Sequence, residues 1–284
     1  MSQIIDLPLL KRIQKPALGS DADKDGRGRV LVIGASQDVP GAVLLTGTAA
    51  LRSGAGKLQL AVAAEAAVVL GAAMPEARII RIAGGDVAAV AEHAARNDAV
   101  VVGPGMMEEE TARRLTRALG AARGEASFVF DAAAMTSLAP EEGRAFGGRL
   151  VLTPHAGEMA ALSGRDKDEV LDEPLEIARE VSAAYQAVVI MKGRDSHVVS
   201  PDGRAWQHVG GVVGLATSGS GDVLAGVVGG LLARGFSPVD AAIIGVYLHG
   251  RAGWRLSHEV GPLGFLAREL PGEIPQIMAE IGAS

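Results

Sequence analysis

A glycine- and serine-rich turn that leads directly into an apolar segment is the part of the sequence best suited to chemistry. The turn holds Gly219, Ser220 and Gly221, and the run that follows predicts a buried helix over residues 221–233. Unpaired backbone N–H groups and the helix dipole favour an anion at such a helix N-terminus. The segment therefore predicts a phosphate site.

Asp222 falls in the first turn of this predicted helix. A carboxylate beside a phosphoryl group can accept the proton of an attacking hydroxyl, which makes Asp222 the candidate catalytic base. The alternative is that Asp222 only caps the helix and that the glycines only permit close packing. Gly226, Gly229 and Gly230 favour a tightly buried helix, which would place the phosphate site in the interior.

A second group of polar residues follows an apolar run at residues 187–191. Lys192 and Gly193 end this predicted strand, and Arg194, Asp195 and Ser196 turn into the next one. Open α/β sheets bind ligands at the carboxyl ends of their strands. We expect Lys192 to meet a nucleotide phosphate there; the alternative is a solvated lysine at the end of a strand.

Two more predicted strands end in residues that could do chemistry. In LTPHAGEM, Pro154 sets a rigid turn before a helix and leaves His155 at the sheet edge as a candidate substrate contact. A lone histidine is more often structural. In FDAAAM, Asp131 could orient a metal-bound water or cap the next helix. Glycine turns at residues 34–42 and 101–106 would let a ligand approach the backbone.

The elements that must position these residues alternate along the chain. Short apolar runs and alanine-rich helical stretches predict parallel strands joined by crossover helices, with PDG as the turn of an antiparallel hairpin. The expected strands are 29–33, 58–62, 77–82, 99–102, 127–130, 150–152, 187–191, 196–200 and 205–208. The expected helices are 43–52, 64–72, 87–95, 108–119, 158–162, 173–185, 221–233, 239–258 and 264–281. Residues 1–28 lack an apolar period and are expected to form a mobile lid or an extended arm.

Composition excludes several classes of protein. The 284 residues contain no cysteine, so disulfides, thiolate chemistry and cysteine-held metals are excluded. The net charge is −6, and acidic and basic residues are interspersed along the chain, so the sequence shows no basic patch for nucleic acid. The sequence shows neither a secretory signal nor an apolar run long enough to span a membrane, so a cytoplasmic protein is expected.

Seven motifs occur in a fixed order from about Arg29 to the C-terminus. They are GASQDVPGA, ALRSGAGKLQLAV, VVGPGM, LTPHAGEM, MKGRDSHVVSPDGR, ATSGSGDVLAGVVGGLLARG and GVYLHGRAG. In this combination the chain resembles the ADP/ATP-dependent NAD(P)H-hydrate dehydratases. The resemblance implies a ribokinase-like three-layer α/β sandwich, with a mainly parallel sheet and helices on both faces. We expect residues 1–284 to form a single domain.

The resemblance also implies a reaction. ADP or ATP would phosphorylate the ring hydroxyl of the S-form of hydrated NADH or NADPH, and phosphate elimination would restore NAD(P)H. Ala42, Gly105, His155 and Asp222 would line the hydrate site, and residues 192–196 with Gly221 would hold the nucleotide. Mg²⁺ is implied between the phosphates, although the sequence has no dedicated cage of ligands for it. A homotetramer and a separate epimerase in the same pathway are further expectations.

Three segments depart from the family pattern. VGGVVG at residues 209–214 replaces an asparagine-containing stretch, DAAA loses a second carboxylate at Ala133, and Gly34, Ala35 and Ser36 replace Gly-Gly-Ser. Two alternatives therefore stay open. One is a small-molecule kinase of the same fold, acting on a sugar, hydroxymethylpyrimidine or hydroxyethylthiazole. The other is a catalytically silent nucleotide-binding paralogue.

Overall fold

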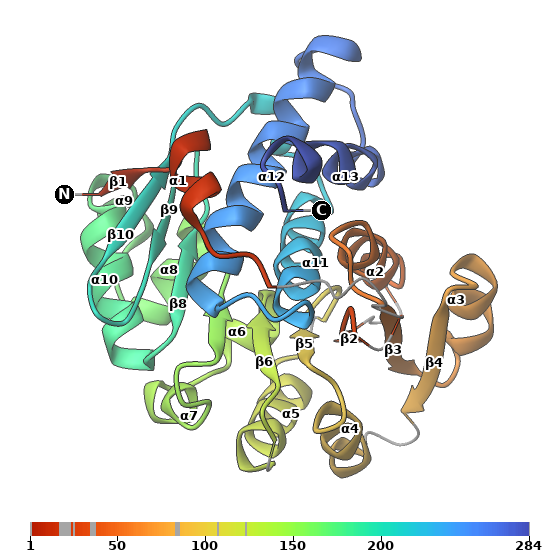
Figure 1. Cartoon of the computed structure of the whole chain (residues 1–284). Helices are drawn as coiled ribbons and strands as arrows, with labels where there is room; N and C mark the ends of the chain where they lie inside the picture. Colours follow the sequence, from red (N-terminus) through yellow and green to blue (C-terminus); the bar gives the residue numbers. More distant parts are fainter. Residues whose placement is uncertain are drawn as a thin grey trace.

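The structure is a computed structural model that describes residues 2–16, 24, 26–34, 38–82, 86–106, 108–122 and 124–283. Its strands are β1 Gln3–Ile4, β2 Arg29–Ile33, β3 Lys57–Ala63, β4 Ala77–Ile82, β5 Ala99–Val102, β6 Ser127–Phe130, β7 Leu150–Leu152, β8 Val188–Met191, β9 Ser196–Val199 and β10 Ala205–His208. Within the described residues they form one ten-stranded sheet in the order β1-β10-β9-β8-β7-β6-β5-β2-β3-β4 (Figure 1).

Nearly all strands of this sheet run in the same direction. Strand β9 pairs antiparallel with both β8 and β10, while the other neighbouring strands pair in parallel. The central strands β5 and β8 are buried along their whole length, as strands covered on both faces require. The mainly parallel sheet and the PDG hairpin predicted from the sequence are confirmed.

Helices cover the sheet in two layers with separate cores. Val30 and Val32 pack into one core, whereas the alternate residues Leu31 and Ile33 pack into the other. The first layer consists of α1 Leu7–Arg12, α2 Ala42–Arg52, α3 Ala67–Ala73, α11 Ser220–Ala233, α12 Pro238–Glu259 and α13 Leu270–Glu280. The second consists of α4 Val87–Ala94, α5 Glu109–Ala121, α6 Ala132–Thr136, α7 Pro140–Arg144, α8 Ala156–Ser163, α9 Lys167–Asp172 and α10 Pro174–Tyr185. This arrangement confirms the predicted three-layer sandwich.

Helix α11 lies in the middle of the first layer, against α2 (Figure 1). The two backbones touch at glycines: a Cβ on Gly226 would lie 2.2 Å from the Thr46 carbonyl oxygen, and one on Gly230 would lie 2.4 Å from that of Ala50. Only a residue without a side chain fits at these positions. The glycine-rich composition of this helix therefore fixes how deeply it sits, as the sequence predicts.

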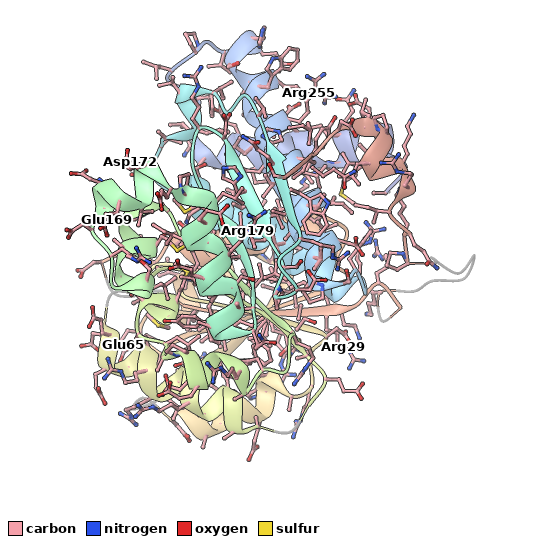
Figure 2. All side chains as sticks on the ribbon, turned by 90° about the vertical axis from the view of Figure 1, so that its left-hand side faces the viewer. Arg29, Glu65, Glu169, Asp172, Arg179 and Arg255 are labelled. Atoms are coloured by element: carbon pink, nitrogen blue, oxygen red, sulfur yellow. The ribbon has the colours of Figure 1, made fainter. Side chains whose placement is uncertain are left out.

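Charged side chains lie both on the surface and in the interior, where Asp131 and Arg234 are buried. Glu169 and Asp172 project from α9 into solvent, while Arg255 joins α12 to α13 by reaching Glu273 and Glu280 (Figure 2). In the described part of the chain, no helix combines the length and the apolar character needed to cross a membrane.

Several short elements were not expected from the sequence. Residues 2–16 contain β1 and α1, which dock on the edge of the sheet through Ile5 and Leu10, whereas residues 1, 17–23 and 25 of the predicted arm lie outside the described residues. Helices α6, α7 and α9 were also missed, and two 3₁₀ turns, Val213–Leu215 and Ala267–Glu269, precede α11 and α13. Helices this short carry too few residues to show an apolar period.

Candidate active site

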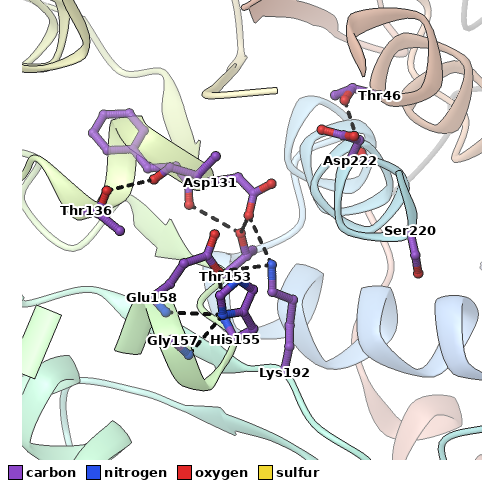
Figure 3. Close-up of polar contacts among 12 residues, drawn as sticks. Thr46, Asp131, Thr136, Thr153, His155, Gly157, Glu158, Lys192, Ser220 and Asp222 are labelled. Atoms are coloured by element: carbon purple, nitrogen blue, oxygen red, sulfur yellow. Dashed lines mark hydrogen bonds and ion pairs between the residues drawn. The ribbon is translucent and has the colours of Figure 1, made fainter. Parts of the chain in front are cut away.

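The sheet brings the predicted loops to one edge. The carboxyl ends of β2, β5, β6, β7 and β8 point the same way because these strands are parallel. The chain leaves β2 for β3 on one side and later returns to place β5 on the other. Such a switch point opens a crevice above the sheet. The first turn of α11 lies across this edge (Figure 3).

The start of α11 has the geometry that the sequence predicts for an anion site. Gly219 is the residue before the helix and adopts a left-handed conformation with φ +87°, where a Cβ would lie 2.5 Å from Leu45. Asp222 lies in the first turn of the helix, whereas the N-cap position is occupied by Gly219. The Thr46 hydroxyl donates to the backbone carbonyl of Asp222 (3.1 Å), which ties this turn to α2.

The carboxyl of Asp222 is held in an unusual environment. Burial raises its pKa, the nearby Asp131 carboxylate raises it further, and the Lys192 ammonium partly offsets both, for a pKa of about 6. Among the described residues no group donates a hydrogen bond to this carboxylate. A carboxyl with this pKa is largely ionised at neutral pH and is basic enough to accept a proton.

Lys192 occupies the centre of the edge. Its Nζ lies 3.2 Å from Asp131 Oδ1 and 3.5 Å from Glu158 Oε2, and its side chain is only 20% exposed (Figure 3). Burial alone would lower the pKa of Lys192, but the two carboxylates outweigh it and the pKa is raised. The alternative of a solvated lysine is therefore wrong. A Cβ on Gly221 would lie 3.4 Å from Nζ, so the ammonium faces the turn that predicts the phosphate site.

The Asp131 side chain bonds to Lys192 and does not cap the helix that follows it. Its side chain makes no capping bond to α6; instead Oδ1 accepts a hydrogen bond from the Thr153 hydroxyl (2.7 Å) and one from Lys192. The capping alternative for Asp131 is wrong. Ala132 directly after it has φ +48°, a left-handed conformation that costs an L-residue about 1–2 kcal/mol. Such strain at the end of a strand is typical of functional sites.

His155 has a structural task and remains open to a ligand. It precedes α8, and its Nδ1 accepts hydrogen bonds from the N–H groups of Gly157 (3.0 Å) and Glu158 (3.2 Å). Glu158 Oε2 in turn accepts from the His155 N–H (2.8 Å). Because Nδ1 accepts, Nε2 carries the proton of the neutral ring. The side chain is 60% exposed, and its Nε2 lies 3.6 Å from Glu158 Oε2.

A cavity of about 990 Å³ opens on this edge and reaches α12. A volume in this range suits a nucleotide-sized molecule. Of the predicted nucleotide-binding residues, Lys192, Gly193, Arg194, Ser196, Ser220 and Gly221 line it, and so does the predicted substrate contact His155. Apolar walls from Val212, Leu215, Leu224 and Val246 surround these polar groups.

The remaining predicted residues do not line this cavity. Asp195 accepts a hydrogen bond from the N–H of Gly210 (3.1 Å), and Gly219 packs under Leu45. Ala42 and Gly105 lie side by side, since a Cβ on Gly105 would lie 3.0 Å from that of Ala42. Of the glycine turn at residues 34–42, residues 35–37 lie outside the described part, and with them two of the three residues that replace Gly-Gly-Ser.

The segment that replaces the family's asparagine-containing stretch forms part of the cavity wall. Gly211 donates its N–H to the carbonyl of Arg194 (2.9 Å), and a Cβ at Gly211 would lie 2.5 Å from that oxygen. Gly210 has φ +92°. These two glycines therefore hold residues 209–214 against the turn after β8.

Three residues of the site were not predicted from the sequence. Glu158 carries a recognisable signal, because a glutamate three residues after a helix cap is typical of a capping box. Thr153 and His249 carry none, because a threonine after a strand and a histidine in the middle of a helix are both common. His249 Nε2 lies 3.0 Å from both the Ser220 hydroxyl oxygen and the Ser220 carbonyl oxygen.

The donor set at this edge suits a magnesium ion held mainly by phosphates. Among the described residues no group of three or more histidine, aspartate and glutamate side chains could hold a metal ion by itself. Mg²⁺ usually takes one or two carboxylates together with substrate phosphates and waters. Asp131 and Glu158 are the carboxylates beside Lys192 that fit this role.

The fold and the site together define a class of protein. A mainly parallel sheet between two helical layers, with a Gly-Ser-Gly-Asp turn opening into a buried helix, is the architecture of a ribokinase-like enzyme. A ribokinase-like superfamily protein from Enterococcus faecalis matches 100% of this chain and 97% of its own, with a TM-score of 0.85 and 25% identity.

Residues 30–276 match the family model described as NAD(P)H-hydrate dehydratase, and the chain belongs to this family. It is 47% identical over 272 residues to the ADP-dependent (S)-NAD(P)H-hydrate dehydratase of Xanthomonas campestris, covering 93% of this chain and 92% of that protein. The ADP/ATP-dependent NAD(P)H-hydrate dehydratase of Bacillus subtilis, co-crystallised with ATP and Mg²⁺, has a TM-score of 0.87 and 28% identity, with 99% of each chain covered. The predicted family and fold are confirmed.

Proposed function

We propose that this protein uses ADP to dehydrate the S-form of hydrated NADH or NADPH and so restores the reduced coenzyme. The observation that carries the proposal is the first turn of α11, where the Asp222 carboxyl, with a pKa of about 6, stands beside Lys192. The family match supports the substrate, and the ADP-dependent Xanthomonas relative supports the choice of nucleotide.

Two sides of the α11 turn suit the two reactants. In Figure 3 the Ser220 side chain points away from the Asp222 carboxyl, with Gly221 between them in sequence. Ser220 and Gly221 line the cavity, whereas Asp222 does not. The nucleotide would therefore approach from the Ser220 side and the hydrate from the Asp222 side, and the transferred phosphoryl group would lie at Gly221.

Each residue then has a definite task. Asp222 accepts the proton of the ring hydroxyl as the hydroxyl oxygen bonds to the terminal phosphorus of ADP. The bond between this phosphorus and the oxygen that leaves with AMP breaks. Lys192 and the N–H groups of the α11 turn stabilise the negative charge on the phosphoryl oxygens. The phosphorylated hydrate then loses inorganic phosphate from C6 and a proton from C5 to water, which restores the ring double bond.

A magnesium ion would neutralise phosphate charge during the transfer. Asp131 and Glu158 would hold it, directly or through water, because they are the carboxylates closest to Lys192. The same two side chains keep the Lys192 ammonium in place.

A recovery assay tests the proposal. Purified protein is incubated with hydrated NADH, magnesium and either ADP or ATP, and the return of reduced-nicotinamide absorbance is followed. Recovery with ADP is expected. Absence of recovery with either nucleotide would leave the kinase and the silent paralogue as the better explanations, and phosphorylation of a sugar or thiazole alcohol would identify the kinase.

The Asp222→Asn variant tests the assignment of the base. It should abolish turnover while binding ADP as the wild type does, because the amide keeps the shape of the carboxyl and cannot accept the proton. An active variant would show that another group is the base.

The single domain, the homotetramer, the cytoplasmic location and the separate epimerase stay predictions. Light scattering of the purified protein measures its mass in solution and tests the tetramer directly.

A further inference from the structure

The contact between His249 and Ser220 links α12 to the first turn of α11. His249 is partly buried and lines the cavity, and Ser220 is only 5% exposed. His249 Nε2 lies 3.0 Å from the Ser220 carbonyl oxygen and 3.0 Å from its hydroxyl oxygen. One ring nitrogen therefore meets two oxygens of the residue that opens the helix.

The contact with the Ser220 carbonyl oxygen favours one tautomer of the ring. A carbonyl oxygen can only accept a hydrogen bond, so we assign the ring hydrogen to Nε2, which lies 3.0 Å from it. The same N–H then reaches the Ser220 hydroxyl oxygen, which accepts. Burial lowers the pKa of His249 to about 4, so the ring is neutral at neutral pH and has this single donor at Nε2.

The hydroxyl hydrogen of Ser220 is left without an acceptor. Within the described residues its oxygen contacts only His249, and that contact uses the histidine's hydrogen. Ser220 lines the same cavity as Gly221 and Lys192. A buried hydroxyl that faces a cavity beside an ammonium group is suited to donate to an anion.

We propose that His249 is a positioning residue, which fixes the Ser220 oxygens through Nε2–H and so turns the Ser220 hydroxyl hydrogen toward a nucleotide phosphate. The inference rests on the proposed function only in taking a nucleotide as the ligand of this cavity. In this arrangement the Ser220 hydroxyl binds the phosphate together with the backbone N–H groups of the α11 turn, and α12 takes part in binding through His249.

Calorimetry with ADP alone, without the hydrate, tests the inference. Loss of a hydrogen bond to a charged phosphate should raise the Kd for ADP roughly ten- to a hundredfold in both His249→Leu and Ser220→Ala. Adenosine has no phosphate, so its Kd should not change in either variant. His249→Gln, whose amide can donate near the position of Nε2, should recover most of the ADP affinity.

The double variant separates positioning from a structural role. If His249 acts through the Ser220 hydroxyl, His249→Leu should change the Kd for ADP less than about twofold in the Ser220→Ala background. Equal losses in both backgrounds, or an equal loss of adenosine binding, would overturn the inference. So would a nitrogen NMR spectrum that places the His249 hydrogen on Nδ1.

The two proposals fail in different ways. A protein that binds ADP with these variant effects but does not dehydrate hydrated NADH would overturn the proposed function alone. A protein that dehydrates the hydrate while His249→Leu binds ADP normally would overturn the positioning role alone.

Discussion

Replacing Asp222 by asparagine should make the protein inactive and more stable. The folded protein holds this carboxyl at a pKa of about 6 against an ordinary value of 3.8. A difference of this size corresponds to about 3 kcal/mol of unfavourable free energy when the group is ionised. Asparagine has nearly the same shape and carries no charge, so the variant should escape this cost.

The stability that the variant gains over the wild type should increase with pH. The folded protein binds the Asp222 proton more tightly than the unfolded chain does, so its free energy of unfolding falls as the pH rises from about 4 to about 6. Above pH 6 the Asp222 carboxyl is ionised in both the folded and the unfolded protein, and the free energy of unfolding falls no further through this group. The variant should therefore match the wild type near pH 4 and exceed it by about 3 kcal/mol at pH 8.

Urea unfolding of both proteins at a series of pH values measures this difference. The two free energies of unfolding should separate between pH 4 and pH 6 and stay apart above it. A difference that is the same at every pH, or an asparagine variant less stable than the wild type at pH 8, would refute the reasoning. Either result would mean that the Asp222 carboxylate is not destabilised by its surroundings.

Three further predictions concern the same region. Because Asp131 raises the pKa of Asp222, Asp131→Asn should move the acid limb of kcat/KM below pH 6. Lys192 lowers that pKa, so Lys192→Gln should move the limb upward and weaken ADP binding, as a pH–rate profile and calorimetry would show. Gly226→Ala should destabilise the protein by about 1–3 kcal/mol or more through its clash with α2, whereas Gly272→Ala, which meets nothing within 4 Å, should be neutral or stabilising in urea unfolding.

Most strands of the sheet could be predicted from the sequence. Strands such as β5 and β8 are apolar along their whole length, and this pattern needs no knowledge of the partner strand. The α11 turn was also predictable, since its glycines, serine and aspartate are consecutive. Short helices such as α6 and α9 were missed because five or six residues cannot show a helical period.

The contacts between residues far apart in the chain could not be predicted from the sequence. Lys192 meets Asp131 across 61 residues, and this pairing depends on β6, β7 and β8 being neighbours in the sheet. The order of strands cannot be read from their apolar runs. His249 is the clearest case, because its contact with Ser220 depends on how α12 crosses α11.

Strand β9 has a practical consequence for engineering the protein. Since β9 pairs antiparallel with β8 and β10, the turn at Pro201–Gly203 lies at the opposite edge of the sheet from the catalytic groups. A peptide tag or a fluorescent label inserted in this turn would be separated from the active site by the length of the strands. The protein could thus be immobilised or labelled there while both reactants keep free access.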